Sequence, residues 1–556
     1  MNRSARIRRI GARAASTLVL ALPLLGACAT AAVDEDRDPV RHLDGSYSPM
    51  RVGSDQSLLK PTTVALADVD GDGFLDLIVG NGGDRAMVTQ QPLLVLRNRT
   101  GDGSASSPDA VAYPPFDLAD QLPFGQAAPY QDVCVGDIDA DGCPDLVAAR
   151  FADSPTDMTM HEVWMNAPAP RASAAAAGGA RCVGYAEQRA YRLTSPIAAA
   201  RSAAGFGCAL GDADGDGDLD LAIAYAYTNE ENPPRTPTDK GNGSLAVYLN
   251  DDGALRLESG PWVPADIKNA RHAGDVIFAD VDLDGRMDLV ASVQGARVYF
   301  GEARGDGSAL ADSAGWSTPP VATSERPEYS MGVDVGWLAD RSTLGIAISM
   351  NENGYWNRQR GRDRVMQPCA SQLAATCHGW TGGVGGEGAD ILIADIDAGA
   401  DLVSTWYSAV EKSATGVEAS TGIYWGIEAA GGPRPQELQS LADDSIVGQG
   451  LALAKLDRVG EERTFEADLR PDASVITILE DDEQPFIHGV RSVTTADGEE
   501  LPFTSVSGQA WVSIPRSADR TEALRVTVTY LASDFPDIVI ADGNGYVQFF
   551  RNLPRH

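Results

Sequence analysis

The sequence has few of the residues on which common catalytic sites depend. Only six histidines occur among 556 residues, and they are scattered without the spacing of zinc ligands. Neither a serine-nucleophile motif nor a phosphate-cradling glycine loop is present. A catalytic function is therefore the less favoured interpretation.

Positive charge is also scarce. The 44 lysines and arginines are outnumbered by 79 aspartates and glutamates, which gives a formal net charge of −35 at pH 7. Such an acidic chain repels the phosphate backbone of nucleic acids, so we expect no nucleic-acid partner. The same excess is typical of exported proteins and of cation-binding proteins.

An apolar run near the N-terminus is too short to span a membrane comfortably. It follows several arginines, and together these features predict that residues 1–27 are a signal peptide. The stretch "LGAC" ending at Cys28 resembles a bacterial lipobox, which predicts a lipid on Cys28. Because Ala29 rather than aspartate follows, we expect attachment to the bacterial outer membrane. The sequence leaves open which face of that membrane carries the protein.

Six of the seven cysteines follow Cys28. An even number in an exported chain indicates disulfides rather than metal thiolates. Cys369 and Cys377 lie close together in a loop-like stretch, so we predict that they pair. The remaining four allow three connectivities, which the sequence does not separate: they are Cys134, Cys143, Cys182 and Cys208.

Four stretches repeat one pattern of aspartates, beginning with "ADVDGDGFLDLIVG" at Ala67. Calcium prefers about six to eight oxygen ligands, and a short loop supplies them from aspartates at positions 1, 3, 5 and 9 and a backbone carbonyl at about position 7. Without a cation the clustered carboxylates would repel one another. The predicted ligands are Asp68, Asp70, Asp72, Phe74 and Asp76; Asp137, Asp139, Asp141, Cys143 and Asp145; Asp212, Asp214, Asp216, Asp218 and Asp220; and Asp280, Asp282, Asp284, Arg286 and Asp288. We therefore expect about four calcium ions.

The flanks of each loop are short and rich in branched residues, as β-strands are. A third strand follows in each repeat, so that each repeat predicts one small antiparallel sheet. With these loops and strands, the chain resembles the FG-GAP or VCBS repeat family, best known from the β-propeller heads of integrin α-chains. The resemblance extends over most of residues 60–556. It implies an all-β, seven-bladed β-propeller with calcium in hairpin loops on one side.

The later repeats depart from this pattern. In the fifth, Trp337 stands at the first ligand position, so we expect no metal there. In the sixth, Asp395, Asp397 and Asp401 remain but the loop is shorter, and the sequence leaves metal binding open. In the seventh, Lys455 takes the first ligand position, and its ammonium group is expected to replace the cation.

The seventh repeat is interrupted. "GLALAKLD" from Gly450 matches the start of a repeat, and "FPDIVIADGNGYVQFFRN" from Phe535 matches its second half. We interpret residues 458–533 between them as an inserted, sandwich-like β-rich domain, since loop tips tolerate insertions. The alternative, a separate C-terminal sandwich after six blades, leaves the final strands unexplained.

The predicted organisation follows from these boundaries. It comprises residues 1–27 as signal peptide, 28–58 as a lipid-anchored tether with a possible ring-closing strand, 59–457 as blades one to six and the start of the seventh, 458–533 as the insert, and 534–556 as the end of the seventh blade. The expected function is a calcium-stabilised lipoprotein that binds a protein or glycan ligand. The alternative is a polysaccharide-acting propeller enzyme.

Overall fold

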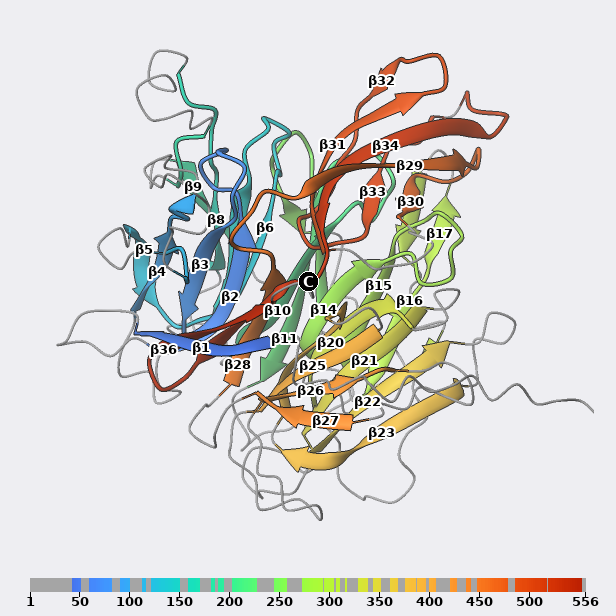
Figure 1. Cartoon of the computed structure of the whole chain (residues 1–556). Coiled ribbons are helices and arrows are strands. Elements are labelled where there is room, and N and C mark those ends of the chain that lie inside the picture. The colour runs from blue at the N-terminus through green and yellow to red at the C-terminus, as the bar shows by residue number, and fades with distance from the viewer. Residues whose placement is uncertain are drawn as a thin grey trace, which may run out of the picture. The chain divides into compact units, whose positions relative to one another are not determined.

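A computed structural model shows a chain built from β-strands (Figure 1). It describes residues 43–51, 60–82, 91–100, 113–116, 122–150, 159–170, 182–185, 189–194, 203–227, 245–257, 273–293, 295–304, 307–310, 316–317, 329–338, 344–351, 361–368, 376–386, 388–396, 400–406, 421–427, 437–441, 448–478, 486–517 and 519–552. Within these residues, no helix is long and apolar enough to cross a membrane.

The first four blades are four-stranded antiparallel sheets, each made from consecutive stretches of chain. Their strands are β2 (Pro61–Ala67), β3 (Asp76–Asn81), β4 (Gln91–Leu96) and β5 (Leu122–Ala128); β6 (Tyr130–Gly136), β7 (Asp145–Arg150), β8 (Thr159–Trp164) and β9 (Ala190–Thr194); β10 (Ala203–Gly211), β11 (Asp220–Tyr227), β12 (Leu245–Leu249) and β13 (Arg256–Leu257); and β14 (Ala273–Ala279), β15 (Asp288–Val293), β16 (Ala296–Tyr299) and β19 (Trp316–Ser317). Between β16 and β19, β17 (Gly301–Arg304) and β18 (Gly307–Leu310) form a separate two-stranded sheet.

Three further sheets have the same antiparallel order. They consist of β20 (Tyr329–Trp337), β21 (Leu344–Asn351), β22 (Gly361–Pro368) and β23 (Thr376–Gly386); β24 (Gly388–Asp395), β25 (Ala400–Trp406), β26 (Thr421–Trp425) and β27 (Glu437–Ser440); and β28 (Gly448–Ala454), β35 (Asp537–Asp542), β36 (Tyr546–Asn552) and β1 (Leu43–Arg51). The N-terminal strand β1 thus forms the outer strand of a sheet whose other members come from the C-terminal part of the chain.

The first strands of the seven sheets form a closed ring. β2 contacts β6 on one side and β28 on the other, and each inner strand between them likewise contacts its two neighbours. The second strands are buried at every residue whose exposure the structure describes, as in "DLIVGN" of β3, because both faces pack against adjacent sheets. This arrangement is a β-propeller, and the prediction of an all-β propeller fold is confirmed.

A separate group of strands comes between β28 and β35 along the chain. It consists of β29 (Glu461–Leu469), β30 (Val475–Thr477), β31 (Phe486–Thr495), β32 (Glu500–Leu501), β33 (Trp511–Ser513) and β34 (Leu524–Ser533), which form one four-stranded and one two-stranded sheet. These strands, orange and red in Figure 1, enclose an apolar core of their own that includes Val493, Val526 and Tyr530. Because Ala454 pairs with Asp537, the chain leaves and re-enters the propeller at one hairpin. We call residues 458–533 the insert.

Candidate metal centres

The predicted calcium loops connect the first and second strands of the first four blades. Each loop brings three carboxylates together, with ligand atoms that lie within 4.8 Å of one another. The four trios are Asp68, Asp70 and Asp76; Asp137, Asp139 and Asp145; Asp212, Asp214 and Asp220; and Asp280, Asp282 and Asp288. The aspartate at position 5 of each loop lies outside these trios: Asp72, Asp141, Asp216 and Asp284.

The first aspartate of each loop closes the loop on itself. A carboxylate oxygen of Asp68 accepts a hydrogen bond of 2.8 Å from the backbone N–H of Gly73. Gly73 has a φ of 96°, which residues other than glycine rarely adopt. Asp137 and Asp280 accept the matching bond from Gly142 and Gly285 at 2.8 Å each, and Asp212 accepts it from Gly217 at 3.1 Å. The repeated glycine therefore fixes the same bend in all four loops.

The ninth residue of each loop ties the loop to the sheet. The carboxylate of Asp76 accepts from the Val69 N–H at 3.0 Å and from the Asn98 N–H at 2.8 Å, so that it joins the loop to the end of β4. The same paired bonds are made by Asp145, Asp220, Asp288, Asp401 and Asp537. This aspartate therefore has a structural role in the sixth and seventh blades as well.

The trios suit a hard cation. Asp68 Oδ1 and Asp139 Oδ1 are buried without a hydrogen-bond partner in the described part of the chain. Burial, reinforced by neighbouring carboxylates, raises the pKa of Asp137 to about 6 and that of Asp280 to about 7. A calcium ion would supply the missing partner and offset the crowded negative charge. The residues present fit calcium on ligand chemistry.

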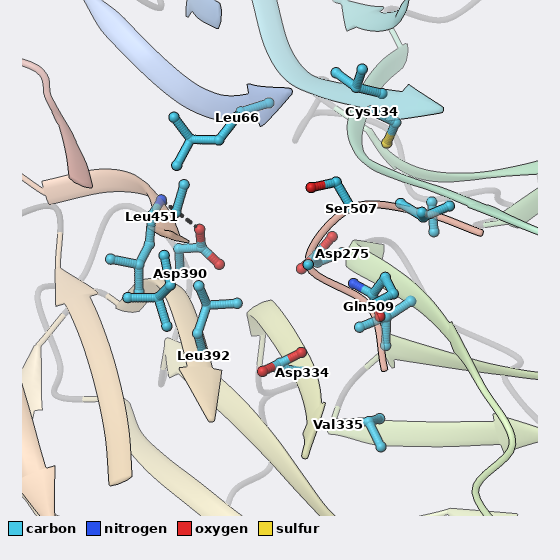
Figure 2. Close-up of a pocket in the computed structure, with 18 of the residues that line it drawn as sticks. Leu66, Cys134, Asp275, Asp334, Val335, Asp390, Leu392, Leu451, Ser507 and Gln509 are labelled. Atoms are coloured by element: carbon cyan, nitrogen blue, oxygen red, sulfur yellow. Dashed lines mark hydrogen bonds between the residues drawn. The ribbon is translucent and has the colours of Figure 1, made fainter. Parts of the chain in front are cut away.

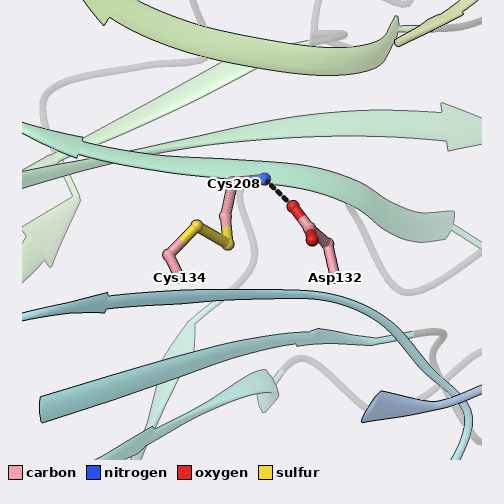
Figure 3. A group of neighbouring side chains, drawn as sticks. All are labelled: Asp132, Cys134 and Cys208. Carbon is pink, nitrogen blue, oxygen red and sulfur yellow. Dashed lines mark hydrogen bonds between the residues drawn. A yellow bond between two sulfur atoms is a disulfide. The ribbon is translucent and has the colours of Figure 1, made fainter. Parts of the chain in front are cut away.

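The structure settles the cysteine pairing that the sequence left open. Disulfides join Cys134 to Cys208 and Cys143 to Cys182. The first links β6 to β10 in neighbouring blades, beside Asp132, whose carboxylate accepts from the Cys208 N–H at 2.9 Å (Figure 3). Because both sulfurs are bonded, this group offers no thiolate to a metal. Of the predicted pair Cys369 and Cys377, Cys369 lies outside the described residues. The predicted lipid site, Cys28, also lies outside them.

The three later blades differ at the first ligand position. Trp337 is buried there in the fifth blade. In the sixth blade, Asp401 accepts the same two backbone hydrogen bonds as its counterparts. Residue 397 lies outside the described residues. In the seventh, Lys455 is 1% exposed and its Nζ lies 2.9 Å from Asp537 Oδ1. Lys455 also donates to the Asn552 carbonyl. A positive charge is thus present where the first four loops hold a carboxylate.

A cavity of about 320 Å³ runs along the axis of the ring (Figure 2). Asp132, Asp275 and Asp390 line it, each at the position five residues before the first loop residue of its blade. Each carboxylate accepts a backbone N–H of the next blade: from Cys208 at 2.9 Å, from Val333 at 3.1 Å and from Leu451 at 2.8 Å. These aspartates therefore fasten inner strands together, a role that sequence reasoning missed.

Glycines alternate with these aspartates around the ring. The equivalent positions hold Thr63, Asp132, Gly207, Asp275, Gly332, Asp390 and Gly450. A Cβ atom at Gly332 would lie 2.9 Å from the Cα of Asp390 on the next inner strand. The two strands can therefore lie this close together only because Gly332 has no side chain. The recurrence of aspartate five residues before a loop was a signal available in the sequence.

Asparagines at the ends of third strands form a second set of links between blades. Asn166 Nδ2 donates to the Val69 carbonyl of the preceding blade at 2.9 Å. Asn98, Asn250 and Asn552 donate in the same way to Leu456, Ile138 and Ile396, each at 2.8 Å. The sequence displays these asparagines at equivalent positions, but their partners lie in other repeats.

Comparison with known proteins agrees with a propeller that carries acidic hairpin loops. The FG-GAP repeat family matches residues 61–106, which contain the first of the predicted calcium loops. No curated protein matches the chain.

Several solved structures resemble the chain at low identity. The Dos1 propeller is 10% identical, with 91% of this chain and 94% of that chain covered and a TM-score of 0.40. Sqt1 of Saccharomyces cerevisiae is 8% identical, with 92% and 100% covered and a TM-score of 0.38. An exo-β-1,3-galactanase from Phanerochaete chrysosporium, solved with β-1,3-galactotriose, is 8% identical, with 73% and 93% covered and a TM-score of 0.27.

Proposed function

We propose that the chain is an exported, calcium-stabilised β-propeller lipoprotein that binds a protein or glycan ligand. The observation that supports this most is the carboxylate trio repeated in the hairpin loops of four successive blades. Calcium bound there would fix the loops, and recognition sites are commonly built on loops that a rigid scaffold positions. Because propellers host many activities, the ligand must be sought at these loops rather than inferred from the fold.

Ligand capture tests the binding function. Immobilised mature chain, residues 28–556, is exposed to a glycan array and to envelope extract, once with calcium and once with chelator. We expect a ligand that is retained with calcium and lost with chelator. Capture that is indifferent to chelator would contradict the role of calcium. Degradation of a polysaccharide on the array would favour the alternative of a polysaccharide-acting enzyme.

Membrane fractionation tests the anchor. We expect the Cys28→Ala variant to leave the membrane fraction, since the thiol that carries the lipid is gone. The matched control Ala29→Ser keeps that thiol and should remain in the outer membrane. Unchanged fractionation of Cys28→Ala would contradict the proposal.

A further inference from the structure

We propose that the insert couples the predicted calcium loops of the third and fourth blades, residues 212–220 and 280–288, with Ser513 as a positioning residue for calcium. Docking of the insert and calcium binding at these two loops then stabilise each other. This inference rests on the calcium binding in the proposed function and gives the insert a regulatory part. The contacts are made at β30 and β33, a two-stranded sheet in which Val475 pairs with Ser513.

Backbone hydrogen bonds attach the start of β30 to the fourth loop. The carbonyl of Gly285 accepts from the N–H groups of Ser474 and Val475 at 2.9 and 3.0 Å. The approach is close, because a Cβ atom at Gly285 would lie 2.4 Å from the Cβ of Ala473. The N–H of Gly285 in turn donates to Asp280, the first predicted ligand, at 2.8 Å. The insert therefore holds the residue that orients this ligand.

A side chain of β33 reaches the first predicted ligand of the third loop. Ser513 Oγ donates a hydrogen bond to Asp212 Oδ2, and both residues are 0% exposed. Just beyond β33, the Arg516 N–H donates to the Gly215 carbonyl of the same loop at 3.0 Å. A hydrogen-bond donor to a metal-ligating carboxylate fixes its orientation. Ser513 therefore positions Asp212 for the cation without being a ligand itself.

The sheet of β30 and β33 packs on the propeller and on the rest of the insert at once. Val475 and Trp511 belong to the apolar core that contains Leu219 of the third loop and Met287 of the fourth. Ile476, on the opposite face of the sheet, belongs to the core of the insert. One small sheet thus contacts both loops. Calcium at either loop should favour docking of this sheet, and hence calcium at the other loop.

The first two loops are more open. A Cβ atom at Gly142, at the bend of the second loop, would meet nothing within 4 Å. Their first predicted ligands, Asp68 and Asp137, are partly buried, whereas Asp212 and Asp280 are 0% and 4% exposed. Because the insert pre-organises the third and fourth loops, we expect these two to bind calcium more tightly than the first two.

Calcium titration of the chelator-treated mature chain tests the positioning residue. Ser513→Ala should keep about four ions, of which one binds about tenfold more weakly. Thr477→Val is the matched control, because Thr477 lies in the same sheet and its Oγ1 has no partner within the described residues. Four unchanged affinities in Ser513→Ala would overturn this inference and leave the proposed function standing. If the unaltered chain binds no calcium, both are overturned.

Hydrogen-exchange mass spectrometry tests the coupling with the insert unaltered. Calcium should slow exchange of the Ser474 and Arg516 amides about tenfold, because both donate to loop carbonyls. Asp280→Asn, in the fourth loop, should weaken this protection at both amides, including that of Arg516 on the third loop. The matched variant Asp68→Asn, in the first loop, should preserve it. Protection weakened at Ser474 alone would show that the two loops are independent and would overturn the inference.

Discussion

Lys455 illustrates how one residue replaces a metal centre. It occupies the first ligand position of the seventh blade, is 1% exposed, and pairs with Asp537 at 2.9 Å. A buried charge is tolerated only when it is paired and hydrogen-bonded. The sequence-based hypothesis that an ammonium group substitutes for the cation agrees with this geometry.

Removing that ammonium group should destabilise the fold strongly. Lys455→Met leaves the buried Asp537 carboxylate without its positive partner, and we expect a loss of about 3–5 kcal/mol in the free energy of unfolding. Chemical denaturation measures the loss, and the double variant Lys455→Met, Asp537→Asn should recover part of it. Arg525→Met, at a side chain that is 62% exposed, serves as the control. A loss below about 1 kcal/mol for Lys455→Met would show that the pair is dispensable.

The four carboxylate trios predict a stoichiometry. Titration calorimetry of the chelator-treated chain should give about four calcium ions, because four loops each bring three carboxylates together. Asp70→Ala should remove or weaken one site and leave the others, whereas Glu466→Ala on the exposed face of β29 should change nothing. An unchanged titration for Asp70→Ala would exclude the first loop as a calcium site.

The calcium-free chain should become less stable as the pH rises. Burial raises the pKa of Asp145 and Asp212 to about 7 from 3.8, so their stabilising contribution is complete below 3.8 and is lost as the pH rises through about 7. Scanning calorimetry between pH 5 and 8 in chelator should therefore show a falling melting temperature. The stabilisation by added calcium should grow over the same range, since the cation binds the ionised carboxylates. A flat profile in chelator would contradict the raised pKa values.

At the scale of single elements, asparagine links join neighbouring blades. Asn166 Nδ2 donates to Val69 of the preceding blade, and its Oδ1 accepts from Ala167 and Gly184 at 2.9 and 2.7 Å. Asn166→Ala should cost about 1–3 kcal/mol of unfolding free energy, because buried backbone groups lose their partners. Asn166→Asp has the acceptor but not the amide donor, so it isolates the link to Val69. Thermal unfolding of both variants measures the effect. If Asn166→Asp is as stable as the unaltered chain, the hydrogen bond to Val69 does not contribute to stability.

Individual elements also show which structural features could be predicted from the sequence and which could not. Loops and inner strands could be predicted because their signal is local: aspartate spacing, glycine at the bend and β-branched flanks. The disulfide between Cys134 and Cys208 could not be assigned, since it depends on β6 and β10 becoming neighbours in the ring. The links made by Asp132, Asp275 and Asp390 and the asparagine links were missed for the same reason, because their partners belong to another repeat.

At the scale of the whole molecule, the insert is expected to be removable. Its ends meet at the Ala454–Asp537 pair, and it has its own core. Replacing residues 458–533 by a short glycine-containing turn should preserve cooperative unfolding of the propeller and about four calcium ions. The melting temperature should fall, because the backbone N–H groups of Ser474 and Arg516 donate to the carbonyls of Gly285 and Gly215 in the predicted calcium loops at 2.9 and 3.0 Å. Circular dichroism measures the unfolding of this variant and calorimetry its calcium stoichiometry. Loss of cooperative unfolding would show that the propeller cannot fold without the insert.

The closure of the ring by β1 has a mechanical consequence. β1, β36, β35 and β28 form one sheet, and the insert departs from β28 and returns to β35. A tension applied between β1 and the insert therefore passes through the hydrogen bonds of this sheet. The insert is also hydrogen-bonded to Gly285 of the fourth blade and Gly215 of the third, so those two blades share part of the load when the molecule is pulled.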